Sequence, residues 1–192
     1  DKYRPQRSDG SLLDEGTLYV ARFNPDGSGD WLALDIDDAG FQQACATAGV
    51  DFVDQGDVMV NTRIAADVVG ATKMDRPEWG AVHPDTGEVY FTLTNNSARQ
   101  DADAANPRAP NPYGHIIRWR EAGRNHAGTR FNWDLYLLAG PEGDSRDPRG
   151  KPLNDENILA SPDGLWFDAE GRLWIQTDMS GSQLSSGPFG NN

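Results

Sequence analysis

The sequence predicts an all-β protein, a partial β-propeller of about two blades of four-stranded antiparallel sheet with a small helical insertion. Three observations favour this fold class. Short apolar stretches separated by turns rich in glycine, proline and aspartate recur along most of the chain. Several of these stretches repeat a common pattern at long intervals, as the blades of a propeller do. Helix-like sequence is confined to residues 38–72.

The first two strands are expected within residues 16–36. The segment GTLYVARF begins at Gly16, the turn NPDGSGD follows, and WLALDI (residues 31–36) forms the second strand. The same plan of glycine, strand, polar turn and strand with a leading tryptophan returns in GHIIRWRE, AGRNHAGTR and FNWDLYLLAG. Gly16 and Gly114 start the two copies, which indicates an internal repeat.

The insertion at 38–72 contains two predicted helices, DAGFQQACATAGV and NTRIAADVVGAT, with Asp38 and Asn61 as their N-caps. The chain's single cysteine, Cys45, lies in the first of them, so no internal disulfide is possible. We expect this thiol to be a small buried apolar side chain rather than a ligand.

A second repeat relates PEWGAVHPDTGEVYFTLTNN, which starts at Pro77, to PDGLWFDAEGRLWIQTDMS, which starts at Pro162. Glu78 and Asp163 hold equivalent positions, and the second copy has a turn one residue shorter. We expect residues 1–192 to belong to one propeller domain. Its strands would form half a blade (16–36), one whole blade (79–82, 88–94, 114–120, 131–138) and half of the next (164–168, 172–177).

Glu78 and Asp163 lead the innermost strands of their blades, so we expect them to converge at the mouth of the propeller channel. Carboxylates brought together need a cation or a shared proton. Calcium suits such a place because it takes several oxygens from carboxylates, amides and backbone carbonyls. Asn95, Asn96 and Asp178 leave neighbouring strand ends and could add further oxygens, although asparagines also serve in turns and caps.

Other polar residues leave alternatives open. Arg76 lies two residues before Glu78 and could bind an anionic substrate, or pair with its neighbour Asp75. The long polar loops 97–112 and 140–160 carry asparagines that could be metal ligands or turn residues: Asn106, Asn111, Asn154 and Asn157.

The composition excludes some classes of partner. The 30 acidic and 17 basic residues give a formal net charge of −13, which would repel a nucleic-acid backbone. No apolar run approaches the roughly 20 residues of a membrane span, so no membrane partner is expected. No signal peptide, nucleophile-elbow, P-loop or dinucleotide-binding motif occurs. The chain begins at Asp1 without methionine, and we expect it to be a piece of a longer protein.

The chain resembles the PhoX alkaline phosphatases. The resemblance rests on strings such as ATKMDRPEW, NPYGHIIRW and ASPDGLWFDAEGRLWIQTD, and it runs along nearly the whole chain. It implies a periplasmic or secreted β-propeller phosphomonoesterase, exported by the twin-arginine route, that carries calcium and iron together. The family's PEW motif belongs to its metal site, which implies metal-ligand roles for Glu78 and for Trp79 through its backbone oxygen. Asp163 and the pair Asn95 and Asn96 follow by the same resemblance.

Two departures from the family pattern qualify this expectation. The family's iron-binding cysteine comes from a segment that would precede this chain, and Cys45 does not match it. Further acidic ligands come from segments that would follow. The expected partners are phosphomonoester small molecules and the remaining propeller blades of a longer parent chain. Two alternatives are a calcium-dependent propeller lactonase of gluconolactonase type, which SPDGLWFDAEGRLW also suits, and a non-catalytic propeller binding domain.

Overall fold

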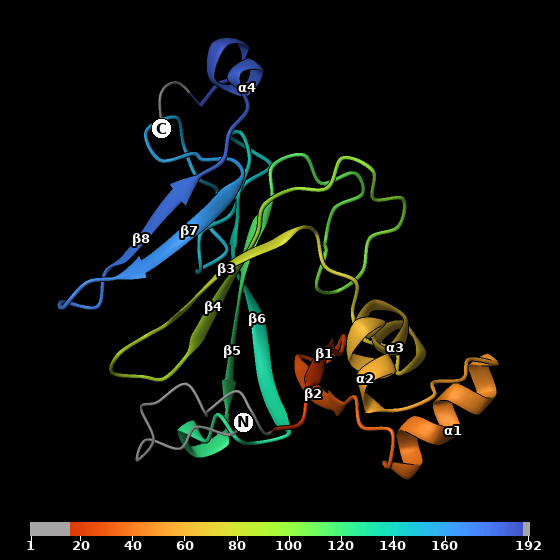
Figure 1. The fold of residues 1–192 in the computed structure, drawn as a ribbon. Helices are drawn as coiled ribbons and strands as arrows, with labels where there is room; N and C mark the ends of the chain where they lie inside the picture. The colour runs from red at the N-terminus through yellow and green to blue at the C-terminus, as the bar shows by residue number, and fades with distance from the viewer. Residues whose placement is uncertain (1–15, 190–192) are drawn as a thin grey trace. The chain divides into compact units, whose positions relative to one another are not determined.

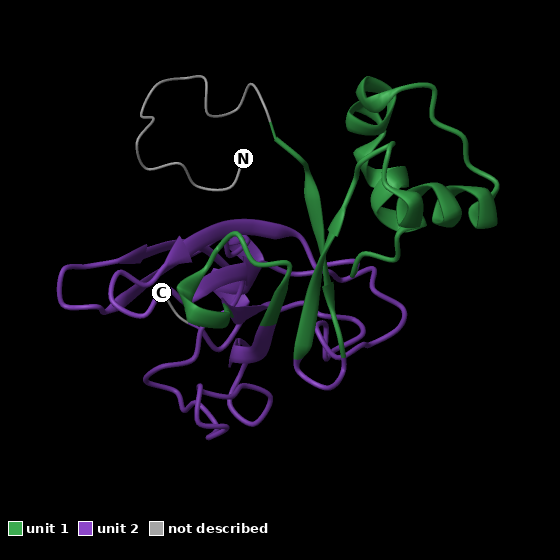
Figure 2. Cartoon of the chain, turned by 90° about the horizontal axis from the view of Figure 1, so that it is seen from below, with its two compact units in different colours: residues 1–24, 28–72, 121–131 green, residues 25–27, 73–120, 132–192 purple. Residues whose placement is uncertain are grey.

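The computed structural model describes residues 16–189 (Figure 1). Residues 1–15 and 190–192, which the domain prediction included, lie outside the described residues. The chain divides into two compact units, residues 1–24, 28–72 and 121–131 as unit 1 and residues 25–27, 73–120 and 132–192 as unit 2 (Figure 2). A single propeller domain over the whole chain stays a prediction.

Unit 1 begins with the hairpin of β1 (Tyr19–Phe23) and β2 (Ser28–Ala33), whose strands are antiparallel. The second strand was expected at 31–36, and that position is wrong by three residues. Gly27 adopts a φ of 84°, which completes the turn early, and the Asn24 amide already donates to the Ser28 carbonyl at 2.8 Å. Pairing therefore starts directly after the glycine.

The rest of unit 1 is helical, with α1 (Ala39–Ala48), α2 (Gln55–Val60) and α3 (Thr62–Val68). Asp38 caps α1 as predicted, because its carboxylate accepts from the Phe41 amide at 2.8 Å. Asn61 precedes α3, but its side chain makes no capping hydrogen bond to the helix. Its side-chain Nδ2 donates to the carboxylate of Asp57 instead. The helix α2 was not predicted. The unit's core contains Leu34, Phe41, Cys45, Val58 and Ala65.

Unit 2 holds the blade that the sequence predicts, apart from the strand residues within 121–131, which belong to unit 1. Its strands are β3 (Pro77–Val82), β4 (Val89–Leu93), β5 (His115–Glu121) and β6 (Arg130–Leu138), and they lie side by side in the order β6, β5, β4, β3 (Figure 1). The pairs β3–β4 and β4–β5 are antiparallel. The long loop 94–114 connects β4 to β5 and lies at the end of the sheet where β3 begins.

The hairpin of β7 (Pro162–Phe167) and β8 (Leu173–Thr177) forms a separate two-stranded sheet, with β7 beside β3 and β4. Apolar side chains fill the space between the two sheets, among them Tyr90, Ile116, Leu137 and Leu165. A short unpredicted helix, α4 (Gly181–Ser186), follows and is capped by Ser180. The strand-rich architecture confirms the predicted partial propeller with its helical insertion. No helix in the described part of the chain is long and apolar enough to cross a bilayer.

Candidate active site

The strand that carries Glu78 is interrupted by a β-bulge. The register of β3 against β4 shifts between Pro77 and Gly80, so that Glu78 and Trp79 together oppose the single residue Thr92. A bulge bends the strand locally and re-aims its side chains, and such bulges are common beside active sites. The sequence repeat correctly marked the place, although strand alternation alone gives no sign of the extra residue.

The second repeat carries the same irregularity. The register of β7 against β8 shifts between Pro162 and Leu165, so that Asp163 and Gly164 together oppose Gln176. The acid that follows the proline is thus the first bulge residue in both hairpins. The structure confirms that the two acids occupy equivalent positions.

Each bulge is preceded by a residue in the left-handed region of backbone space. Arg76 has a φ of 49° and Ser161 a φ of 52°, although neither is a glycine. Their carbonyl oxygens accept equivalent hydrogen bonds from the outgoing strands, from the Thr94 amide at 3.1 Å and from the Asp178 amide at 2.9 Å. Uncommon backbone conformations of this kind persist only where the surroundings hold them, and they cluster at functional sites.

Two buried threonines of β4 and its exit join the bulges to each other. The Thr92 hydroxyl lies 2.9 Å from the carbonyl of Asp163 and accepts from the Trp79 amide at 2.9 Å. The Thr94 hydroxyl donates to the carbonyl of Pro162 at 3.0 Å. Both threonine residues are fully buried, so these hydrogen bonds hold the two bulges together although they belong to separate sheets.

Arg76 lies at the centre of the polar side chains that these strand ends bring together. Its Nη1 donates to Oδ1 of Asn95 at 3.1 Å, and its Nη2 lies 3.4 Å from Oε1 of Glu78 and 3.7 Å from Oδ2 of Asp178. Half of the Arg76 side chain remains exposed to solvent. We call the group formed by Arg76, Glu78, Asn95, Asp163 and Asp178 the twin-bulge site.

The charges of this site act on Asp163. Partial burial raises the pKa of Asp163, the negative charges of Glu78 and Asp178 raise it further, and the Arg76 guanidinium lowers it. Two carboxylates, those of Glu78 and Asp178, contact the Arg76 guanidinium, and Asp163 interacts electrostatically with all three groups. An additional cation would relieve the repulsion that remains, and the carboxylate oxygens of the site are donors that calcium prefers.

The family comparison fits this arrangement. A model of the PhoX alkaline phosphatase family matches residues 1–191. The chain belongs to the PhoX family.

A solved structure of a PhoX protein agrees with this assignment. The chain is similar to Pseudomonas fluorescens PhoX in complex with vanadate, a transition state analogue, with 43% sequence identity and a TM-score of 0.77. The match covers 95% of this chain and 33% of that one, so the chain spans about a third of its length. No curated protein sequence gave a match.

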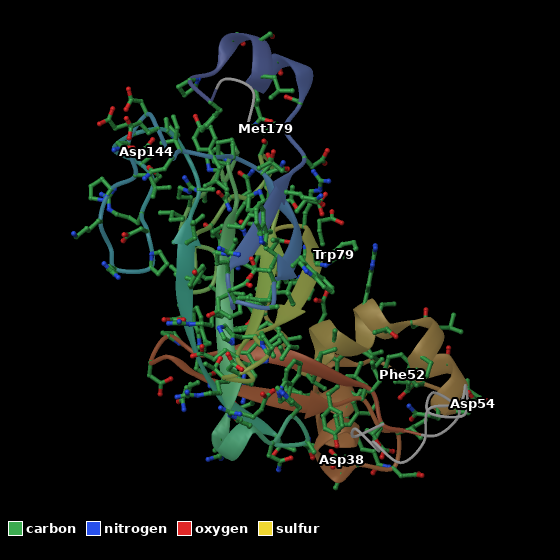
Figure 3. All side chains as sticks on the ribbon, turned by 90° about the vertical axis from the view of Figure 1, so that its left-hand side faces the viewer. Asp38, Phe52, Asp54, Trp79, Asp144 and Met179 are labelled. Carbon is green, nitrogen blue, oxygen red and sulfur yellow. The ribbon has the colours of Figure 1, made fainter. Side chains whose placement is uncertain are left out.

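Asn96 and Trp79, to which the PhoX resemblance also gives ligand roles, do not belong to the twin-bulge site. The backbone of Asn96 pairs with that of Asn111, and its side-chain oxygen accepts from the Ala98 amide at 3.1 Å, as in a turn. Trp79 is 53% exposed, and its backbone oxygen lies 3.3 Å from the Thr92 hydroxyl. Figure 3 labels this residue on β3. Ligand roles for both residues stay predictions. Within residues 16–189, no three His, Cys, Asp or Glu side chains converge closely enough to hold a metal ion by themselves.

Sequence reasoning missed a buried polar network directly before Arg76. One alternative had Arg76 pair with its neighbour Asp75. Asp75 is instead fully buried and has other partners. Its carboxylate accepts from Nε of Arg99 and from Nδ2 of Asn111, the latter at 2.9 Å. Arg99 and Asn106 also donate to the carbonyl of Lys73, at 2.7 and 2.9 Å. This network holds the loop after β4 against the start of β3.

His115 completes the network. Its Nδ1 accepts from the amide nitrogen of Asn111 at 3.0 Å, so its Nε2 carries the proton and donates to the carbonyl of Ala105 at 2.7 Å. Burial lowers the pKa of His115 to about 4, which keeps the ring neutral.

The loop asparagines are structural in this arrangement. Asn106 and Asn111 are fully buried in the network. Asn157 accepts from the Asn154 amide at 2.8 Å within a turn. Cys45 lies in the helical core of unit 1, where burial raises the pKa of its thiol.

Proposed function

We propose that this chain contributes the twin-bulge site to the active centre of a metal-dependent phosphomonoesterase. The observation that carries the proposal is the placing of Glu78 and Asp163 on equivalent bulges, joined by buried threonines, with Arg76 beside them. Membership of the PhoX family supports the reaction class. The lactonase and the non-catalytic alternatives find no such support.

The donor set of the site fits calcium better than iron. Glu78, Asp163 and Asp178 offer carboxylate oxygens, which are hard ligands that suit calcium. The amide oxygen of Asn95 is already engaged by Arg76. The described residues place no thiolate or imidazole there, and Cys45 is buried in unit 1. We therefore assign to Glu78 and Asp163 a share in holding calcium. We expect the iron, and the remaining oxygen ligands, to be held by other parts of a longer protein.

Bound metal ions would supply positive charge that stabilises the phosphate oxygens and activates an oxygen nucleophile. Arg76 would bind the phosphate directly, since a guanidinium presents paired N–H donors that match two phosphate oxygens. Its contacts to Glu78 and Asp178, at 3.4 and 3.7 Å, are long, and half of the side chain is exposed. A phosphate oxygen can replace either carboxylate contact of Arg76 without disturbing the buried hydrogen bonds of Thr92 and Thr94 that join the two bulges.

The longer protein is itself part of the proposal. The chain spans about a third of the PhoX structure that it matches, and the twin-bulge site lacks enough oxygens for a complete calcium shell. We expect the longer protein to be periplasmic or secreted, as the family resemblance implies.

The test is an assay of the full-length protein with p-nitrophenyl phosphate, with and without a chelator, beside a panel of lactones. We expect release of phosphate that the chelator abolishes and that calcium and iron together restore. Absence of phosphate release, or phosphate release at the same rate with and without the chelator, would contradict the proposal. Hydrolysis of the lactones instead would favour the gluconolactonase-type alternative.

A further inference from the structure

We propose that Ser161 is a positioning residue, which fixes the Arg76 guanidinium for phosphate binding by anchoring the carboxamide of Asn95. The inference rests on the proposed function, in which Arg76 contacts the phosphate. It adds a residue that neither the sequence motifs nor the acidic repeat singled out.

The three side chains form a continuous chain of hydrogen bonds. The hydroxyl oxygen of Ser161 accepts from Nδ2 of Asn95 at 3.2 Å, and Oδ1 of Asn95 accepts from Nη1 of Arg76 at 3.1 Å. Both ends of the carboxamide are therefore engaged. With its amide end held by Ser161, Asn95 cannot turn its oxygen away from the guanidinium without losing the second bond.

Ser161 is a rigid anchor because its backbone is held on both sides. Its amide donates to the carbonyl of Tyr113 at 2.7 Å, its carbonyl accepts from the Asp178 amide at 2.9 Å, and the residue is fully buried. Arg76, in contrast, is long and half exposed, and its other contacts in the site are long. A flexible side chain of this kind gains a defined position only from a fixed partner, and the partner that leads back to the buried frame is Asn95.

The identity of the residue at position 161 supports a role for its hydroxyl. With a φ of 52°, the backbone adopts a conformation that glycine accepts without steric cost and that other residues rarely adopt. An unfavourable backbone conformation that is retained with a side chain in hydrogen-bond contact with the site suggests that the side chain is used.

The backbone conformation also provides a discriminating variant. Ser161→Gly removes the hydroxyl and at the same time relieves the backbone. If Ser161 were merely structural, this variant would be as stable as the wild type, or more so, and would bind phosphate equally well. If Ser161 positions Arg76, phosphate binding weakens even though stability is kept.

The experiment compares full-length wild type, Ser161→Gly, Arg76→Ala and the double variant. The control is Ser145→Ala, which alters a buried serine whose hydroxyl has no hydrogen-bond partner among the described residues. The measurements are KM and kcat for p-nitrophenyl phosphate, the inhibition constant of inorganic phosphate, metal content and thermal stability. Loss of one neutral hydrogen bond predicts that Ser161→Gly raises KM and the inhibition constant together by roughly three- to tenfold. We expect kcat to change less, and metal content and stability to be kept.

The double variant tests whether the effect passes through Arg76. In the Arg76→Ala background, Ser161→Gly should cause no further loss of phosphate affinity, because residues that act as one unit are not additive. Full additivity, an unchanged inhibition constant in Ser161→Gly, or loss of metal from that variant would overturn the inference while leaving the proposed function intact. A wild type that releases no phosphate would overturn both.

Discussion

The variant Asp75→Asn should loosen the loop 97–112 from the start of β3. The wild-type carboxylate accepts from Nε of Arg99 with one oxygen and from Nδ2 of Asn111 with the other. A carboxamide offers a single oxygen, so its NH2 group must face one of these two donors. Asn111 cannot compensate by rotating, because its own oxygen already accepts from the Gly114 amide at 3.1 Å.

The size of the effect follows from burial. Asp75 is fully buried and the Arg99 side chain is only 11% exposed, so water replaces little of what is lost. Removing one partner of a buried ion pair costs about 3–5 kcal/mol. Arg99 keeps its bond to the carbonyl of Lys73, which favours the lower end, about 3 kcal/mol. Since about 1.4 kcal/mol corresponds to a factor of ten, local opening should become roughly a hundredfold more frequent.

Hydrogen exchange followed by mass spectrometry on the full-length protein measures this opening directly. Peptides from the loop 97–112 should exchange about a hundredfold faster in Asp75→Asn, while peptides from β8 keep their wild-type rate. Asp101→Asn, which alters an exposed acid of the same loop, serves as the control and should exchange normally. A change of less than about threefold in Asp75→Asn would refute the argument that this network holds the loop.

Three further predictions concern other parts of the chain. Cys45→Ala should leave turnover and metal content of the full-length protein unchanged and cost only about 1 kcal/mol of packing; loss of iron in this variant, measured by elemental analysis, would make Cys45 a ligand. Because burial lowers the folded-state pKa of His115 from 6.5 to about 4, its contribution to stability should be complete above pH 6.5 and fall as the pH drops, by about 2 kcal/mol at pH 5. Urea unfolding of wild type and His115→Gln between about pH 7.5 and pH 5 measures this loss, and an equally steep decline in both would contradict it. Residues 1–192 alone should show no appreciable phosphatase activity with calcium and iron added, and chelator-sensitive turnover within about tenfold of the full-length protein would show that they hold the complete site.

Much of the fold could be predicted because the strands carry local signals. Apolar runs bounded by glycine- and aspartate-containing turns marked the eight strands of residues 16–189, although β2 begins three residues earlier than expected. The repeated proline–acid pattern marked the equivalent positions of Glu78 and Asp163, but not the bulges on which they lie. The helix α2 escaped notice because QGDVMV is short and contains a glycine, so it shows little helical periodicity. Its N-cap, Asp54, was the available signal, since its carboxylate accepts from the Asp57 amide at 2.8 Å.

The site could be predicted only in part. The repeat identified Glu78 and Asp163, but the residues that fix their surroundings are polar side chains distant in sequence. Asp75, Asn111 and His115 follow no periodic pattern. Only the burial of Asn111 shows that it belongs to the buried polar network and is not a metal ligand. Ser161 was missed for a similar reason, because a single serine before a proline gives no indication of its backbone conformation.

The decisive measurement is the metal content and phosphatase turnover of full-length Glu78→Gln beside Glu170→Gln. Glu170 is an equally charged residue in the turn between β7 and β8, where it pairs with Arg172 at 2.7 Å. If Glu78 helps to hold calcium, Glu78→Gln loses calcium and its turnover falls at least roughly a hundredfold. Mutating even the hydrogen-bond partners of metal ligands lowers metal affinity or activity about ten- to a hundredfold. Glu170→Gln should keep both its calcium and its turnover. A Glu78→Gln protein with its full metal content and wild-type turnover would contradict the assignment of the twin-bulge site as part of the metal centre.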